Sequence, residues 1–456
     1  MGVVLFTIIK MDIKQRIRNP LTWFIIMILF IMSMLNIIEL NESRLNRPFN
    51  GHYVAGLDNV INLHIWGHFA NEREKVMFPK AFYSRQMLDK TRADILKAKG
   101  ENNVKEITRL MAFYELLQAK AGYVTNDPIM STVFKNKAME MWNDVSGGIP
   151  YDDIDFYPKG AVFEEGKYQS LLNAKYYHSL YKNDLEPIYS DDVNNVTYLY
   201  YYFFNIATRF IIVIPILFIY NIINKDKNTG SLKLIITQSI SRRKYYIGKW
   251  ISGVIQVIFV FLFPPIIISA ILGVTNGFVS VKYPVIYLRD SMASLKTIPN
   301  YFDAIKAQAG YYPQFSFTET FNYYAPSHKV IVHPGHFYPD HRMEIIPFYK
   351  YLLMVILLSV LFIAFAVALV QLISAIIDKE IISFVAAALV FVIGTIANSP
   401  FKQEKNLNLS PFTMEHASRI VIGTYNVTAL GSTLILLAST ILLLMIGCRY
   451  FKKKAI

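Results

Sequence analysis

Four histidines close together are the densest group of possible metal ligands in the sequence: His328, His333, His336 and His341, with Asp340 beside the last. Histidine is the commonest metal ligand in proteins, but these spacings match no standard zinc motif. The acidic run YDDIDF, residues 151–156, offers carboxylates that could bind a cation, within a stretch typical of loops. We predict surface histidines, a solvated acidic loop and no metal site.

Motifs for catalysis are also missing from the sequence. It contains no G-x-x-x-x-G-K-[ST] phosphate-binding loop, no LSGGQ-type signature, no H-E-x-x-H motif and no nucleophile elbow. We therefore predict no catalytic residues, no enzyme activity and no cofactor bound by this chain itself.

Three residues interrupt long apolar runs and are candidates for a pathway or a hinge. Arg209 lies in the apolar run 202–223, where a charge is costly. Its guanidinium either extends to the lipid headgroups or faces a pathway, where it would meet an anionic substrate. Pro264 and Pro265 lie in the run 250–274 and predict a kink, which serves either as a hinge or only to shape the helix.

The stretch NKDKNTGSLKLIITQSISRRKYYIGKW, residues 224–250, is basic and amphipathic. Leu232, Ile235, Ile236 and Ile240 fall on one side of a helix that starts near Gly230, with polar residues on the other side. Taken alone, this pattern predicts a helix that lies on a membrane surface and binds lipid headgroups.

Long apolar segments define the elements that must position these residues. About 20 apolar residues in a helix cross a bilayer core of about 30 Å. Six segments qualify: 21–40, 202–223, 250–274, 351–377, 381–398 and 427–448. We predict an α-helical polytopic membrane protein with six transmembrane helices. The first shows no cleavage site after it and should stay as an anchor.

Lysine and arginine set the predicted orientation, because they are enriched in the cytoplasmic loops of membrane proteins. They gather in residues 1–20, an amphipathic N-terminal segment, in the loop 224–249 and in the tail 449–456. With six spans, all three lie on one side, so both termini are predicted to be cytoplasmic. The net charge of +13 then faces anionic lipid headgroups, and we predict no nucleic-acid binding.

The other segments are predicted to be extracellular. Residues 41–198 are long enough for a domain that is mainly α-helical, with a helix from Ser84 to Lys99 that stops at Gly100, a second from Asn103 to Ala121, and a third within 168–189. Residues 275–347 form a second insert, with short strands at 315–326 and 328–333. Residues 399–426 are predicted to hold one or two short helices. The only cysteine is Cys448, so disulfides cannot hold these domains together.

The pattern TGSLKLIITQSISRRKYYIGKWISG resembles the cytoplasmic loop of ABC-2 type transporter permeases. The matching residues are Gly230, Ser231, Leu232, Ser239, Ile240, Ser241, Arg242, Lys249 and Gly253. The resemblance extends over the six spans, the cytoplasmic ends and the basic N-terminal segment. The chain departs from the family at Ser239, where proline is usual, at Asp226, where glutamate is frequent, and in the length of its second insert.

The resemblance implies that this loop contains a coupling helix, which docks in a groove of a separate ABC ATPase. The implied coupling residues are Gly230, Ser231, Leu232, Ile236, Thr237, Gln238, Ser239, Ile240, Ser241, Arg242 and Arg243. The implied partners are ABC ATPase subunits, which bind the ATP, a second permease in a homodimer or heterodimer, and membrane lipids.

We expect a permease subunit that exports an amphipathic or hydrophobic substrate, such as a peptide, lipid or drug, across a cytoplasmic membrane. The composition points to a bacterial membrane. The alternative is a membrane sensor or immunity protein that binds a ligand through its extracellular domain without transport. A sensor needs a cytoplasmic signalling domain, for which no predicted inner segment is long enough.

Overall fold

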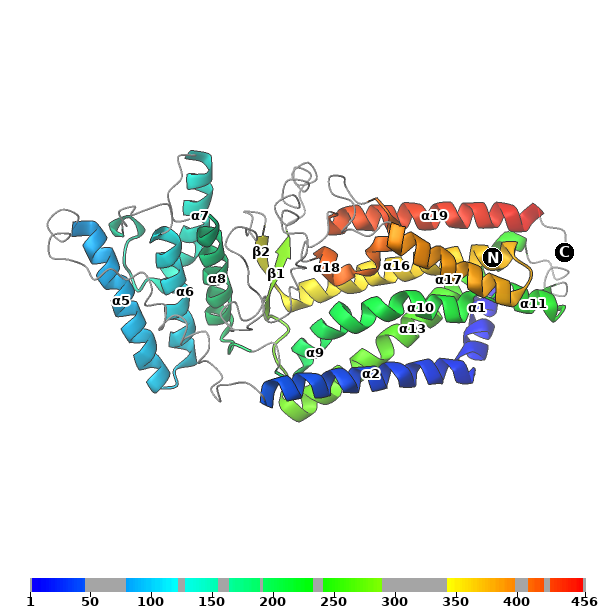
Figure 1. Cartoon of the computed structure of the whole chain (residues 1–456), viewed down its shortest axis with the longest axis horizontal. Coiled ribbons are helices and arrows are strands. Elements are labelled where there is room, and N and C mark those ends of the chain that lie inside the picture. The colour runs from blue at the N-terminus through cyan, green and yellow to red at the C-terminus, as the bar shows by residue number, and fades with distance from the viewer. Residues whose placement is uncertain are drawn as a thin grey trace.

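The computed structural model describes residues 2–45, 79–121, 128–154, 164–188, 192–232, 241–288, 343–397, 409–421 and 427–453. These residues are mostly helical. A bundle of long helices runs along the molecule, and a separate group of helices lies at one end of it (Figure 1). We call this group, residues 79–188, the distal domain. The opposite end of the bundle, where the two chain termini lie, is the terminal end.

Within the residues that the structure describes, seven main helices form the bundle. They are α1 (Gly2–Ile17), α2 (Pro20–Leu45), α10 (Ala207–Ile219), α13 (Arg242–Asn276), α16 (Phe348–Ile376), α17 (Glu380–Ala397) and α19 (Ala429–Lys453). Among the described residues, 5 helical segments are long and apolar enough to cross a membrane: Pro20–Asn41, Asn195–Asn228, Arg242–Asn276, Phe348–Ile376 and Ala429–Lys453. Five of the six predicted spans are therefore confirmed as apolar helices of sufficient length. The remaining predicted span, 381–398, corresponds to α17, which is apolar but shorter.

The core of the bundle surrounds α16. This helix packs against α19, α10, α13 and α17, and its side chains Phe362, Ile363 and Val367 are completely buried. Helices α2, α17 and α19 instead expose apolar side chains along their length. An apolar exposed surface on a helix of this length is suited to lipid or to another membrane subunit.

The second span is less regular than its sequence predicted. It comprises α9 (Asn195–Tyr201), the π-helical turn η3 (Tyr202–Ile206), α10 and, after a turn, the short helix α11 (Asn224–Asn228). Asn194 caps its start, since its side chain accepts from the backbone N–H groups of Val196 and Thr197. Phe261, one turn before Pro265 in α13, packs against Tyr202 and Phe203 of η3. Pro265 has no N–H to donate to the Phe261 carbonyl one turn earlier, and the Tyr202 hydroxyl donates to that oxygen at 2.6 Å.

The distal domain consists of α5 (Pro79–Gly100), α6 (Val104–Ala121), α7 (Pro128–Val145), the 3-10 turn η2 (Tyr151–Asp153) and α8 (Glu164–Asn183). Its mainly helical character and the helices predicted at 103–121 and within 168–189 are confirmed. The start predicted at Ser84 is wrong. The helix begins at Pro79, and the Ser84 hydroxyl donates to the Lys80 carbonyl inside it. Helix α7, which was not predicted, buries Trp142 against Phe113.

Two short antiparallel strands join the distal domain to the bundle. Strand β1 (Pro284–Leu288) pairs with β2 (Met343–Pro347), with Ile286 opposite Ile345. Just before β1, the Tyr283 hydroxyl is 2.8 Å from that of Tyr176 on α8, and its carbonyl accepts from the N–H of Phe348 at the start of α16. The strands predicted at 315–326 and 328–333, and the four histidines, lie outside the described residues.

The segment before α19 confirms the prediction of short helices. It contains the 3-10 turn η4 (Pro411–Glu415) and α18 (Ala417–Val421). Phe412 inserts against α17, because its ring occupies the space beside Gly394 where a Cβ atom would lie. The two short elements therefore close the distal end of the bundle between α16, α17 and α19.

Candidate functional site at the terminal end

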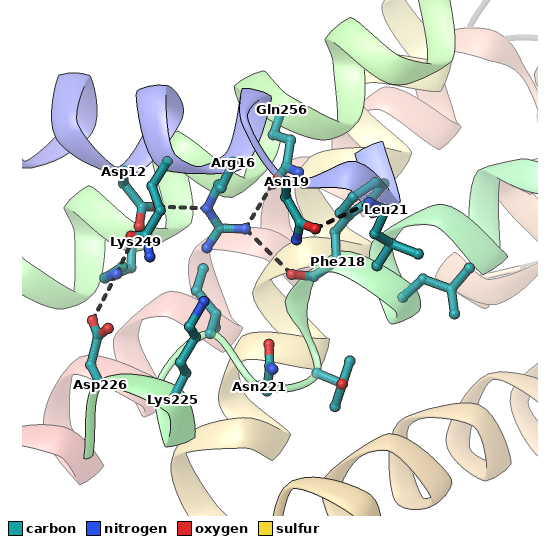
Figure 2. A pocket seen from close by; sticks show the side chains of 14 residues that line it. Asp12, Arg16, Asn19, Leu21, Phe218, Asn221, Lys225, Asp226, Lys249 and Gln256 are labelled. Atoms are coloured by element: carbon teal, nitrogen blue, oxygen red, sulfur yellow. Dashed lines mark hydrogen bonds and ion pairs between the residues drawn. The ribbon is translucent and has the colours of Figure 1, made fainter. Parts of the chain in front are cut away.

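Buried charges gather at the terminal end, where α1, α11 and the start of α13 meet. Lys249 on α13 lies between two carboxylates, with its Nζ atom 2.8 Å from Asp12 Oδ1 and 2.7 Å from Asp226 Oδ2 (Figure 2). Asp12 and Lys249 are both 7% exposed. We call these three residues the clamp. It joins the N-terminal helix, the first turn of the loop 224–241 and the third span.

The Asp12 carboxylate has further partners besides Lys249. Arg16 Nε lies 2.7 Å from its carboxylate, and the Ser252 hydroxyl donates to the same oxygen. Burial alone would raise the pKa of the Asp12 carboxyl group, but the charges of Arg16 and Lys249 and the hydrogen bonds from Lys249 and Ser252 lower it from 3.8 to about 2. Asp12 is therefore a carboxylate at neutral pH.

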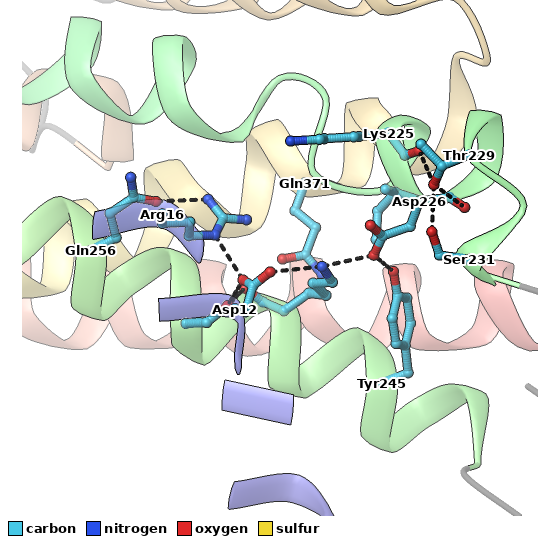
Figure 3. Close-up of polar contacts among 12 residues, drawn as sticks. Asp12, Arg16, Lys225, Asp226, Thr229, Ser231, Tyr245, Gln256 and Gln371 are labelled. Atoms are coloured by element: carbon cyan, nitrogen blue, oxygen red, sulfur yellow. Dashed lines mark hydrogen bonds and ion pairs between the residues drawn. The ribbon is translucent and has the colours of Figure 1, made fainter. Parts of the chain in front are cut away.

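Arg16 and Tyr245 extend this network on either side of the clamp. Arg16 Nη1 donates to Gln256 Oε1 at 2.7 Å and to the Phe218 carbonyl at 3.3 Å, which links α1 to α13 and to the end of α10. The Tyr245 hydroxyl donates to Asp226 at 2.5 Å (Figure 3). A buried charge is tolerated only when it is paired and hydrogen-bonded, and this network meets that requirement.

The opposite side of α11 is bonded to the turn between α16 and α17. Lys227 Nζ lies 2.6 Å from Asp378, Asn228 donates to Glu380 at 3.0 Å, and the Asn224 amide donates to the Ile377 carbonyl at 2.7 Å. Helix α11 is thus bonded on one side to α13, and through Lys249 to Asp12 of α1, and on the other side to α16 and α17. A displacement of α11 would act on four helices together.

The predicted coupling residues follow α11 directly, and the structure describes part of them. Gly230 has a φ of 74°, a conformation that favours glycine. The Ser231 hydroxyl lies 2.5 Å from that of Thr229, and Leu232 is buried. The other predicted residues of this helix, Ile236, Thr237, Gln238, Ser239 and Ile240, lie outside the described residues.

After that segment, the chain enters α13 earlier than predicted. Ser241 caps the helix by accepting from the Lys244 N–H. Arg242 donates to the carbonyl of Lys452 near the end of α19 at 3.2 Å, and Arg243 is exposed in the first turn. Residues 242–249 were predicted to belong to the loop 224–249, but they are helical. The ion pairs of the clamp allow this helix to carry Lys249 into the interior as part of the third span.

The remaining predicted residues lie elsewhere. Arg209 is exposed on α10, whereas Pro264 and Pro265 are buried within α13. None of the three contacts the clamp. Asp152 of the acidic run is paired with Lys135 at 3.0 Å, and the described part of the chain contains no group of three or more residues suited to hold a metal ion.

Asp12 was not among the predicted site residues, Asp226 was noted only as a departure from the family pattern, and Lys249 only as a positive charge and as one of the residues that match that pattern. One signal was available: Asp12 is the only acid among Lys10, Lys14, Arg16 and Arg18 on an amphipathic segment. Its partner could not be identified, because Lys249 lies 237 residues away in the sequence.

A bundle of long apolar helices with a buried ionic network at one end is typical of a multi-pass α-helical membrane protein. Residues 6–455 match the family described as ABC-2 family transporter protein. The chain therefore belongs to this family and is a permease of an ABC transporter, the membrane component of the transport system, for which association with an ABC ATPase is general. No curated protein matches the chain, and no solved structure does.

Proposed function

We propose that the chain is the membrane-spanning subunit of an ATP-driven exporter, with six crossings and both termini in the cytoplasm. In this proposal, α17 makes the fifth crossing, the loop 224–241 faces the cytoplasm, and the distal domain and the second insert are extracellular. Two observations support it: both termini lie at the same end of the bundle (Figure 1), and the last turns of α1 and α19 carry basic residues, namely Lys14, Arg16, Lys452 and Lys453.

The clamp is the observation that carries the proposed mechanism. Residues 230–241 would dock on the ABC ATPase, and closure of the ATPase would displace them as a stiff element. Asp226 lies one turn before this segment and is paired with Lys249, which is paired with Asp12. The movement would therefore reach α13 and α1 through buried ion pairs, and the α16–α17 turn through Lys227.

The pathway would lie between two copies of the permease or between this chain and a related one. An amphipathic or hydrophobic substrate would enter from the cytoplasm or the inner leaflet and leave past the distal domain, across a bacterial cell membrane. The exposed Arg209 is the candidate for an anionic group of the substrate. The wide apolar surfaces of α2 and α19 supply area for a second subunit and for lipid.

Co-purification with a partner ABC ATPase tests the proposal. Replacing residues Thr237–Ser241 by glycine and serine should abolish co-purification and ATP-dependent transport. A control variant, Glu101→Ser with Asn102→Gly, changes an exposed turn of the distal domain and should leave both intact. Unchanged association of the loop variant would remove the coupling assignment.

A further inference from the structure

A polar cavity of about 150 Å³ lies beside the clamp, between α1, the end of α10, α11 and α13. Its wall includes Arg16, Lys225 and Lys249 as cations and Asp12 and Asp226 as anions. Both carboxylates are already paired with Lys249. One positive charge in the wall therefore has no counterpart, and a cavity lined in this way does not suit an apolar ligand.

The excess charge belongs to Lys225. Within the part of the chain that the structure describes, its ammonium group makes no ion pair and no hydrogen bond. Figures 2 and 3 both show it directed towards the side of the cavity where Arg16 lies. Arg16 uses Nε and Nη1 for its contacts with Asp12, Phe218 and Gln256, so its Nη2 atom is left to face the cavity. Two cations that face one space repel each other unless an anion lies between them.

A neutral donor, the side-chain amide of Asn19, also lines the cavity. The Asn19 side chain accepts the N–H of Leu21 through its oxygen, so its amide nitrogen is available to donate into the cavity (Figure 2). An ammonium, a guanidinium nitrogen and an amide around one space match an anion with several acceptor oxygens. A phosphate group has this chemistry, and guanidinium and ammonium groups are the side chains that bind it.

The position of the cavity points to lipid as the source of this phosphate. Leu21 in the first turn of α2 and Leu217 in the last turn of α10 line it, so it lies where two spans end. Trp23, Phe24, Met27 and Ile31 are exposed on α2 and begin an apolar face beside the cavity. Tryptophan is enriched at the level of the headgroups, and basic pockets between spans bind anionic headgroups.

We propose that this cavity binds a phosphate-bearing anion through Lys225, Arg16 and Asn19, with a phospholipid headgroup as its source and its acyl chains along α2. A bound anion would neutralise the excess charge and connect α11 to α1 next to the clamp. This proposal requires only that the chain is a membrane protein, and it does not depend on ATP-driven export.

Lipid binding to the purified full-length chain tests the proposal. Native mass spectrometry would compare phosphatidylglycerol with phosphatidylcholine for the natural sequence, Lys225→Gln, Lys225→Arg and Lys14→Gln. Lys14 is exposed on α1 and does not line the cavity. One cation near a headgroup contributes about 1 kcal/mol, so Lys225→Gln should weaken phosphatidylglycerol binding about fivefold. Lys225→Arg and Lys14→Gln should retain it.

A second measurement separates the two sources of phosphate. Inorganic phosphate is titrated into the lipid-free chain while thermal unfolding is followed. Stabilisation by inorganic phosphate that is lost in Lys225→Gln, without a preference for phosphatidylglycerol, would support a soluble phosphate compound as the ligand. Equal losses of phosphatidylglycerol binding in Lys225→Gln and Lys14→Gln would overturn the proposal, and so would unchanged binding of both probes to Lys225→Gln.

Discussion

At the scale of single residues, the negative charge of the buried Asp12 carboxylate is stabilised by the donors and cations around it. A carboxylate in the interior is unfavourable unless several donors replace water. Asp12 has Arg16, Lys249 and Ser252 around it, and they lower its pKa to about 2. The ion pairs are therefore already formed at neutral pH, and the helices that they join are held by charge as well as by apolar contact.

This lowered pKa predicts a pH-dependent effect of Asp12→Asn. A shift from 3.8 to about 2 corresponds to about 2 kcal/mol of stability at neutral pH. Because the folded pKa is the lower one, this contribution is present above about pH 4 and is lost as the pH falls to about 2. Thermal unfolding in detergent should show a lower midpoint for Asp12→Asn at pH 7 and a difference that shrinks as the pH falls through about 2. The exposed Asp153→Asn should match the natural sequence throughout, and a difference for Asp12→Asn as large at pH 2 as at pH 7 would contradict the assignment.

A second prediction at this scale concerns the hydroxyl of Tyr202. It satisfies the carbonyl that Pro265 leaves without a donor, so Tyr202→Phe buries an unsatisfied oxygen, at a cost of about 1–3 kcal/mol. Thermal unfolding should reveal the loss. Tyr220→Phe serves as the control, since the described residues contain no hydrogen-bond partner for that hydroxyl. Equal midpoints for both variants would show that the bond does not contribute.

At the scale of elements, sequence periodicity predicted the long apolar helices well and missed features that depend on tertiary contact. Ala138, Met141, Trp142 and Val145 of α7 recur at helical spacing and are all buried, so this helix was predictable from the sequence. Ser84 is a frequent N-cap residue type, but its hydroxyl can equally bond to a carbonyl within a helix. The helix boundary at Arg242 was not predictable, because it depends on burying Lys249 between acids from two distant segments.

Strands β1 and β2 and the π-helical turn η3 were also not predicted from the sequence. Strand β1 is only 5 residues long and pairs with a segment more than 50 residues away in the sequence, so no local hairpin signal exists. The π turn at Tyr202–Ile206 leaves an apolar helical pattern almost unchanged. In both cases the pairing or the irregularity is determined by packing against another element.

Close approach of three helices at Gly253 gives a prediction at this scale. A Cβ atom at Gly253 would lie 2.9 Å from Ile219 Cδ1 on α10 and 3.1 Å from Val367 Cγ1 on α16. Gly253→Val should therefore force the helices apart and destabilise the protein by about 1–3 kcal/mol. Gly100→Ala is the control, because no atom lies within 4 Å of a Cβ there. A Gly253→Val protein as stable as the control in thermal unfolding would refute this packing.

At the scale of the whole molecule, the bundle separates two regions that the proposal places on opposite sides of the membrane. Cys448 is the only cysteine, so Cys448→Ser gives a background for single-cysteine labelling. A membrane-impermeant maleimide should modify a cysteine at Glu101, in the distal domain, in intact cells. A cysteine at Thr229, near the clamp, should react only after permeabilisation. Both positions are exposed. Labelling of Thr229→Cys in intact cells would place the clamp on the extracellular side and contradict the proposed orientation.

The most direct test is to reconstitute the permease with its ABC ATPase and to measure how much substrate is transported for each ATP that the ATPase hydrolyses. Asp226→Asn breaks the clamp where the coupling segment begins and leaves residues 230–241 unchanged, so the ATPase should still bind and hydrolyse ATP. Coupling energies of 1–3 kcal/mol predict that transport per ATP falls about tenfold. Asp152→Asn, which breaks the exposed pair with Lys135 in the distal domain, should leave the ratio unchanged. An unchanged ratio for Asp226→Asn would contradict the claim that the clamp carries the movement of the ATPase into the spans.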